Sequence, residues 1–181
     1  MSTHHDIYST LKDFIGFTDA DAEHLTALAP IFAQYGAEIT DGFYAQLLQR
    51  EDAAALLEGQ VDRLKRTHTR WMGELFAGEY GEAYFENRWK IGLAHVRVGV
   101  KPWYVEAVTS YLRAAGLTAL QREVKDPELL AARAASLIKI LDLDLMIINL
   151  AYGEERLDRL SSFTGMSRKL LERCVSQARA K

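Results

Sequence analysis

Histidine is the residue type in this sequence with the widest choice of chemistry, because a neutral imidazole can bind a metal, accept a proton or donate a hydrogen bond. Of the five histidines, His4, His5 and His24 lie in polar or terminal surroundings, where we expect exposed side chains. His68 and His95 fall on apolar faces of predicted helices. A lone histidine on such a face is more often a hydrogen-bonded structural residue than a metal ligand, so position alone leaves both roles open.

The usual signatures of hydrolytic and nucleotide chemistry are missing from the sequence. It contains no HExxH pair, no carboxylate–histidine cluster and no glycine-rich phosphate loop. The scattered Asp and Glu residues offer no paired general acid and base. Cys174 is the only cysteine, so the chain can form no internal disulfide and has no CxxCH motif.

The most specific signal lies in residues 91–104, which read IGLAHVRVGVKPWY. This histidine, followed by Arg-Val-Gly and then by a proline and a Trp-Tyr pair, resembles the proximal segment of the bacterial globin-coupled sensors, a haem-binding family related to the protoglobins. In ITDGFYAQLL, the pair Phe43 and Tyr44 resembles the family's distal tyrosine segment, and Arg70 and Trp71 resemble the Arg-Trp pair of its distal helix. The resemblance covers roughly residues 18–160.

The resemblance implies a haem b that is held non-covalently, with His95 as the iron ligand. A single axial histidine leaves the other face of the iron open to a gas, so we expect a five-coordinate, high-spin ferrous iron without ligand. Ile91, one turn earlier, and Val98, just after, are expected to supply apolar contacts to the haem. A hydrogen-bond acceptor should orient the other ring nitrogen of His95, and either Tyr104 or a helix carbonyl is expected to serve.

The distal pocket is expected on the helix that carries His68. Leu64, Thr67, His68 and Trp71 are spaced at i, i+3, i+4 and i+7 and share one helical face, which the resemblance implies lines the pocket together with Phe43. The resemblance further implies that Leu64 and Thr67 point at the gas, while His68 lies one position further around the helix. We therefore place Thr67 above His68 as a contact to the gas. The alternatives are that all four are ordinary core, and that His68 is a second iron ligand.

Tyr44 bears on which gas the protein binds. A phenol is protonated near pH 7, so it can donate a hydrogen bond to the terminal atom of O2, which carries partial negative charge. CO carries less charge and gains less from such a bond. We therefore expect O2 as the signal, contacted by Tyr44 and Thr67, with CO and NO as further ligands. The alternative for Tyr44 is a core aromatic whose hydroxyl bonds to a backbone carbonyl.

The pattern of apolar and helix-breaking residues predicts the all-α elements that must position these side chains. Only three prolines and twelve glycines interrupt stretches rich in Ala, Leu, Arg and Glu, which favour helix over strand. Thr18 and Asp21 resemble a capping box, and Gly99 with Pro102 marks a helix end and a corner. A polar, alanine-rich connection through Gly59 is expected to lack a fully developed short helix. The predicted helices span residues 4–14, 18–30 with a break at Pro30, 30–50, 61–76, 82–98, 102–122 and 127–160, with another after an interruption at 161–165.

These elements suit a globin-like helical sandwich with an extra N-terminal helix. We expect an N-terminal extension at 1–17, a globin sensor domain at 18–160 and a linker helix at 161–181 that leads to an output domain outside this chain. The apolar stripe of residues 127–160 is too broad for simple surface packing. Together with the resemblance, it predicts a homodimer that is built from residues 102–122 and 127–160.

The overall charge and hydropathy exclude some partners. A formal net charge of -3 gives no reason to propose nucleic acid. No charged start followed by an apolar run marks a secretory signal, and no stretch of about 18 apolar residues could span a membrane. We therefore expect a cytoplasmic protein without a membrane partner.

The function that the resemblance implies is haem-based O2 sensing in a bacterial signalling protein. The chain itself would not be an enzyme, and it would regulate a diguanylate cyclase, a histidine kinase or a chemotaxis transducer. Three alternatives stay open: a haem enzyme such as an NO dioxygenase or peroxidase, a haem-free globin fold that serves as an interaction module, and simple O2 storage.

Overall fold

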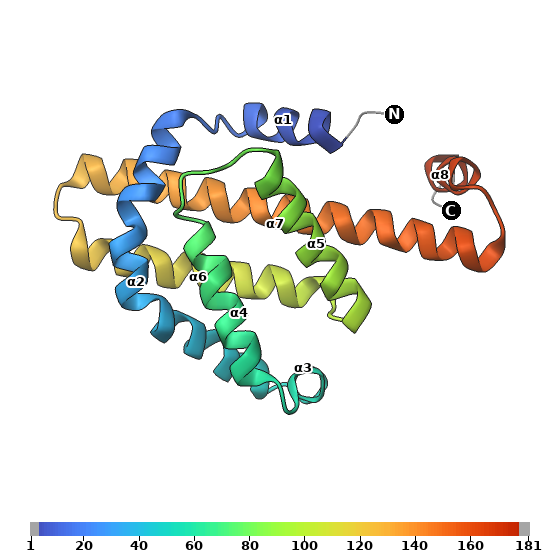
Figure 1. Ribbon diagram of the computed structural model, residues 1–181, viewed down its shortest axis with the longest axis horizontal. Coiled ribbons are helices and arrows are strands. Elements are labelled where there is room, and N and C mark those ends of the chain that lie inside the picture. The colour runs from blue at the N-terminus through green and yellow to red at the C-terminus, as the bar shows by residue number, and fades with distance from the viewer. Residues whose placement is uncertain (1–3, 178–181) are drawn as a thin grey trace.

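The computed structural model describes residues 4–177, in which every regular element is a helix, so the predicted all-α class is confirmed (Figure 1). Seven of the eight helices belong to the body of the molecule, and α8 lies beyond it. In chain order they are α1 (His4–Phe14), α2 (Asp19–Leu48), α3 (Glu51–Leu57), α4 (Val61–Glu74), α5 (Glu82–Val98), α6 (Pro102–Glu123), α7 (Pro127–Thr164) and α8 (Arg168–Gln177).

Helix α2 continues through Pro30, where the sequence predicted a break, so that prediction is wrong. The start of the helix agrees with the sequence, because the Asp21 carboxylate accepts the backbone N–H of Thr18 at 2.9 Å. Pro30 lies on the exposed side of α2, while Leu28 and Phe32 on either side of it are buried. A proline inside a helix costs about 3 kcal/mol, and burial of the flanking apolar side chains outweighs that cost.

Two further element predictions are corrected. The connection before Gly59 contains the short helix α3, which begins with Glu51 and Asp52, and two acidic residues favour the N-terminus of a helix through its dipole. Helix α7 does not stop before residue 161 but continues to residue 164. It ends at Gly165, whose φ of 70° is a left-handed conformation that glycine adopts without strain.

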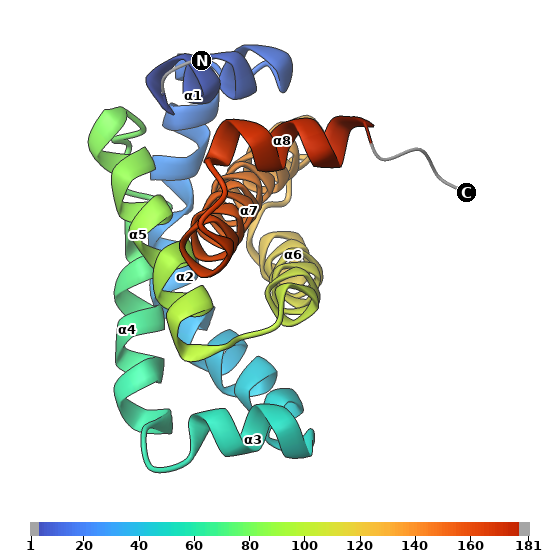
Figure 2. The same ribbon diagram turned by 90° about the vertical axis from the view of Figure 1, so that its right-hand side faces the viewer.

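The helices form two layers that cross. The hairpin of α6 and α7 lies across α2, α4 and α5, and α7 extends past the body to the turn before α8 (Figures 1 and 2). Gly92 of α5 allows a close approach between the layers: a Cβ there would lie 2.6 Å from the Cβ of Ala151 and 3.0 Å from the carbonyl oxygen of Ile148 on α7. This contact brings the backbone of α5 against α7 one turn before His95.

Most of the buried apolar side chains form one core between the layers, including Leu25, Leu28, Leu120, Leu137, Ile140, Leu143 and Ile147. The extra N-terminal helix α1 joins this core through Tyr8, whose hydroxyl donates to the carbonyl of Tyr80 at 2.9 Å. Within residues 4–177 no helix combines the length and the apolar character needed to cross a bilayer.

Candidate functional site

His95 lies in the last turn of α5 with its ring nitrogens in different environments. The Nδ1 atom is 2.9 Å from the carbonyl oxygen of Ile91. A carbonyl only accepts, so Nδ1 carries the proton and Nε2 keeps a free electron pair. Burial lowers the pKa of His95, against the opposing effect of the Ile91 carbonyl. The ring is therefore neutral near pH 7, as a metal ligand must be.

The acceptor that orients His95 is thus the helix carbonyl, and Tyr104 does not serve in this way. The hydroxyl of Tyr104 donates instead to Oδ1 of Asp52 at 2.5 Å. This bond joins the first turn of α6 to α3. The partner of Nδ1 is the carbonyl of Ile91, four residues earlier in the same helix.

The apolar residues expected beside His95 differ in exposure. Ile91 is half-buried, while Val98 is 60% exposed at the end of α5. Gly99 ends the helix with a φ of 81°, and the backbone N–H of Val100 bonds to the carbonyl of His95. The side chain of Val98 therefore leaves apolar surface available for a contact close to His95.

His68 on α4 is held by a side chain from α2. Its Nδ1 lies 2.9 Å from the hydroxyl oxygen of Thr40, and that hydroxyl donates its only proton to the carbonyl of Gly36 at 2.7 Å. Nδ1 of His68 must therefore be the donor to Thr40, which leaves the electron pair on Nε2. Nε2 is buried without a hydrogen-bond partner among the described residues. Burial lowers the pKa of His68 to about 4, so the ring is neutral.

Two aromatic rings pack against His68, and one of them also packs against Tyr44. The His68 ring centroid lies 4.6 Å from that of Phe43 and 4.8 Å from that of Trp71. The Phe43 and Tyr44 rings lie 4.5 Å apart. The structure therefore brings together Phe43, Tyr44 and His68, three of the residues that the sequence singled out for the distal side.

Tyr44 is buried, at 7% exposure, yet its hydroxyl has no hydrogen bond to any residue in the described range. Burial raises the pKa of Tyr44 to about 12, and the nearby charge of Arg63 opposes this rise. The hydroxyl is therefore protonated at neutral pH and free to donate. The alternative of a core tyrosine bonded to a backbone carbonyl finds no support in these contacts.

Leu64 and Thr67 lie on the same helix as His68 but are placed differently. Leu64 is half-buried against the core, whereas Thr67 is exposed. The Thr67 hydroxyl donates to the carbonyl of Arg63 in its own helix at 3.1 Å. The hydroxyl proton of Thr67 is therefore used within its own helix. Contact between Thr67 and a gas stays a prediction.

Several residues that shape this region were not found from the sequence. Thr40 and the buried pair Arg88 and Asp144 carry no motif, and their partners come from other helices. Asp144 offered one signal, since it interrupts the apolar run LDLDLMII in the middle of α7. His24, expected to be exposed, is half-buried, and its Nδ1 lies 3.1 Å from the hydroxyl oxygen of Ser136.

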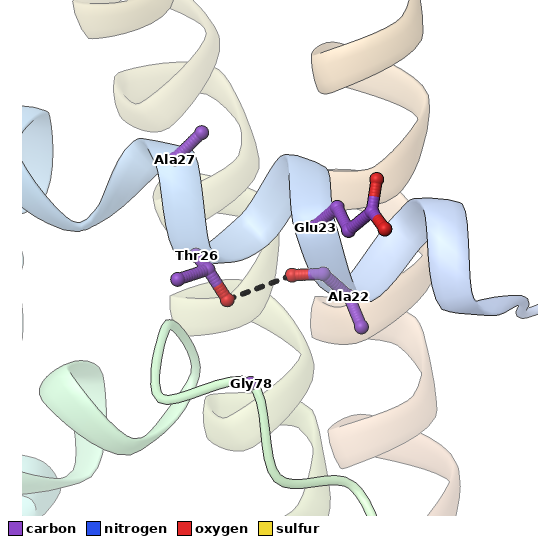
Figure 3. A pocket seen from close by; sticks show the side chains of 5 residues that line it. All are labelled: Ala22, Glu23, Thr26, Ala27 and Gly78. Carbon is purple, nitrogen blue, oxygen red and sulfur yellow. Dashed lines mark hydrogen bonds between the residues drawn. The ribbon is translucent and has the colours of Figure 1, made fainter.

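An open depression on another part of the surface has a different character (Figure 3). Its lining consists of small side chains and one carboxylate, contributed by Ala22, Glu23, Thr26, Ala27 and Gly78. The Thr26 hydroxyl is already bonded to the Ala22 carbonyl at 2.9 Å. The depression shares no residue with the sites of His68 and His95, and its lining contains no histidine or cysteine.

The two histidines fit the requirements of a haem. Each has its Nδ1 proton bonded to an oxygen and presents Nε2 as an electron-pair donor, which is the tautomer that binds iron through Nε2. Among the side chains that the structure describes, those of residues 6–177, no three from His, Cys, Asp or Glu gather to hold a metal ion. A haem needs only one protein ligand, because the porphyrin supplies the others.

Comparison with known proteins identifies the family. A sequence profile described as Protoglobin matches residues 5–158. The globin domain of the Geobacter sulfurreducens globin-coupled sensor is 37% identical, with a TM-score of 0.77 over 80% of this chain and 96% of that one. The globin domain of E. coli DosC in a ferric form is 17% identical, with a TM-score of 0.66 over 82% of this chain and 99% of that one, a likeness of fold alone.

These matches confirm the globin-like fold that the sequence predicted. This chain therefore belongs to the protoglobin family and has the fold of the globin domains of globin-coupled sensors.

Proposed function

We propose that the protein is a haem-based O2 sensor domain that binds haem b without a covalent bond. The observation that carries this proposal is the pairing of a neutral His95, with a free Nε2, and a buried Tyr44, with a hydroxyl free to donate. The similarity to the Geobacter sulfurreducens sensor domain supports it. When bound, the haem iron supplies the open position at which a diatomic gas binds.

Each residue of the site has a separate task in this proposal. His95 holds the iron through Nε2, and the Ile91 carbonyl keeps its ring in the binding tautomer. Ile91, Val98, Leu64 and Phe43 supply apolar contacts to the haem. Tyr44 donates a hydrogen bond to the gas, which favours O2 over CO because O2 carries more negative charge. Thr67 adds a smaller polar contact, and Tyr104 closes the end of the site by bonding α6 to α3.

The geometry of His68 favours the role that the sequence left as an alternative, that of a second iron ligand. Because Thr40 takes the Nδ1 proton, Nε2 has no proton to donate to a gas. A buried nitrogen with an unused electron pair is costly unless it finds a partner. His68 would thereby be suited to bind a haem iron through Nε2 in competition with the gas.

We further propose a homodimer formed by α6 and α7. Three apolar positions of the α7 stripe differ in exposure: Ile138 is 36% exposed, Leu145 is half-buried and Leu141 is 3% exposed. Ile138→Glu should therefore shift the protein from dimer to monomer without unfolding it, whereas Leu141→Glu should unfold it. Sedimentation at tens of micromolar protein measures the first effect and circular dichroism the second. A parent that sediments as a monomer would contradict the dimer.

The signalling partner is proposed from the same similarity. A C-terminal output domain, such as a diguanylate cyclase, a histidine kinase or a chemotaxis transducer, would receive the signal from α7 and α8 in the bacterial cytoplasm. In this proposal the chain itself catalyses no reaction.

Absorption spectroscopy of the purified protein tests the proposed function. We expect a Soret band, reversible O2 binding by the ferrous protein, and CO binding that displaces O2. A protein that takes up no haem would be an interaction module instead. Rapid turnover of NO with O2, or of peroxide, would favour a haem enzyme.

A further inference from the structure

A buried ion pair lies where three helices meet, outside the residues assigned to the haem site. Arg88 of α5 is 0% exposed and Asp144 of α7 is 2% exposed. The Nε atom of Arg88 lies 2.9 Å from Oδ2 of Asp144, and the guanidinium also pairs with Glu74 of α4. Neither the sequence motifs nor the proposed gas binding gives these charges a role.

The Asp144 carboxylate receives hydrogen bonds from both helices that carry the histidines. Trp71 of α4 donates its indole N–H to Oδ2 at 2.8 Å, and Tyr84 of α5 donates its hydroxyl to Oδ1. The Trp71 ring packs against that of His68, 4.8 Å away. Arg88 lies two helical turns before His95, on the same face of α5. One carboxylate of α7 thus contacts the helix of each histidine.

Stability alone does not account for such a cluster. The free-energy cost of removing two charges from water is about as large as the gain from their attraction. Well-packed apolar residues in their place often stabilise a fold equally well. Burial raises the pKa of Asp144, and the protein opposes this rise with Arg88 and with the two hydrogen bonds from Tyr84 and Trp71. What these directional contacts provide is a fixed position of α4 and α5 relative to α7.

We propose that Asp144 couples the two haem-facing helices to α7, so that a shift of α4 or α5 on gas binding moves the part of α7 that extends toward α8 (Figure 1). The inference rests on the proposed gas sensing and names the residue through which the signal leaves the haem site. Coupling of this kind requires that the Asp144 contacts differ in free energy between the gas-free and gas-bound arrangements.

Two buried tyrosines provide a matched test. Tyr84→Phe removes the hydroxyl that reaches Asp144 and keeps the ring. Tyr80→Phe is the control, because Tyr80 is also a buried residue, its ring lies 5.3 Å from that of Tyr84, and its hydroxyl donates to the carbonyl of Leu75 instead. Asp144→Asn is the stronger change, since it removes one of the two counter-charges of Arg88 and leaves only Glu74. Tyr84→Phe keeps the test decisive if Asp144→Asn does not fold.

The measurement is hydrogen–deuterium exchange of residues 153–164 in the ferrous protein, with and without CO. We expect CO to change this exchange in the parent and equally in Tyr80→Phe. In Tyr84→Phe the change should fall below half of the parental value, and in Asp144→Asn it should vanish, while CO still binds to every folded protein.

The outcomes separate this inference from the proposed function. A full CO-dependent change in Tyr84→Phe, or in a folded Asp144→Asn, would overturn the coupling role. So would a parent that binds CO without any change in residues 153–164. A parent that takes up no haem and binds no CO would overturn the proposed function itself, and the inference with it.

Discussion

The two histidines of the site are held in the same tautomer by contacts of different kinds. His95 bonds to a carbonyl four residues earlier in its own helix, so α5 alone fixes its orientation. His68 bonds to Thr40, a residue 28 positions away on another helix, and its ring packs between aromatic side chains of α2 and α4. In the proposed site, the proximal side therefore depends on one helix, whereas the distal side depends on how two helices pack.

This difference has a functional consequence. A ligand held within one helix keeps its geometry when neighbouring helices shift, which suits a permanent iron ligand. A residue held between helices responds to their relative movement, which suits the side that must distinguish gases. The predictions that follow test this contrast, beginning with the largest effect.

Loss of the proximal ligand should have the largest effect. His95→Ala is expected to lose most of its haem, because no other histidine lies on α5. The haem-to-protein ratio after gel filtration measures the loss. His68→Ala is the control and should keep its haem. Full retention by His95→Ala with an unchanged ferrous spectrum would show that the two sides have been assigned the wrong way round.

The distal histidine should make the apoprotein sensitive to acid. Its pKa is about 4 in the folded protein and about 6.5 when unfolded, so the unfolded chain binds more protons between these values. The free energy of unfolding should therefore fall as the pH drops from about 6.5 to about 4, by up to about 3 kcal/mol. Urea unfolding at several pH values measures it. A His68→Gln variant with the same pH dependence as the parent would contradict this role of His68.

Removal of the distal donor should weaken O2 binding by about tenfold. Tyr44→Phe keeps the ring and deletes the hydroxyl, and a hydrogen bond to a partly charged group is worth roughly 1.5 kcal/mol, or about one decade in affinity. The loss should appear as faster O2 dissociation in stopped-flow measurements. CO affinity should change much less, since the pocket volume is nearly preserved. Equal losses for both gases would mean that Tyr44 acts by packing.

Removal of His68 should strengthen gas binding severalfold if His68 competes for the sixth position, because the fraction of binding-competent protein rises. His68→Leu should then convert a low-spin absorption spectrum of the gas-free protein into a high-spin one. Thr40→Val, which removes the acceptor for Nδ1, should give a partial conversion. A gas-free parent that is already high-spin and five-coordinate would show that His68 leaves the iron free.

The smallest effect is expected from Thr67, whose hydroxyl already donates within its own helix. Thr67→Val should change the rate of O2 dissociation by less than about threefold. This corresponds to less free energy than one neutral hydrogen bond typically contributes. The double variant Tyr44→Phe with Thr67→Val should release O2 faster than either single variant. If O2 dissociation from the double variant matched that of the parent, neither residue would contribute to sensing, whatever the role of His95.

The sequence by itself determined most of the helices and named His95 as the candidate iron ligand. The spacing of apolar residues predicted α5 at the bounds that the structure has, and the motif around His95 named the family that the comparisons confirm. These features follow from interactions at fixed sequence separation, such as the bond from His95 to Ile91 and the turn at Gly99. Such interactions repeat wherever the same residues occur at the same spacing, so they can be inferred without a structure.

Only the tertiary structure shows which groups hold His68 in place and where the buried charges of Arg88 and Asp144 lie. Thr40 selects the tautomer of His68, Tyr104 bonds to Asp52 rather than to His95, and helix α2 continues through Pro30. Each outcome depends on which groups other helices bring close and on how much water they exclude. The cost of an unpaired buried group and the gain from burial are properties of the packed protein, because both depend on neighbours that sequence separation does not specify.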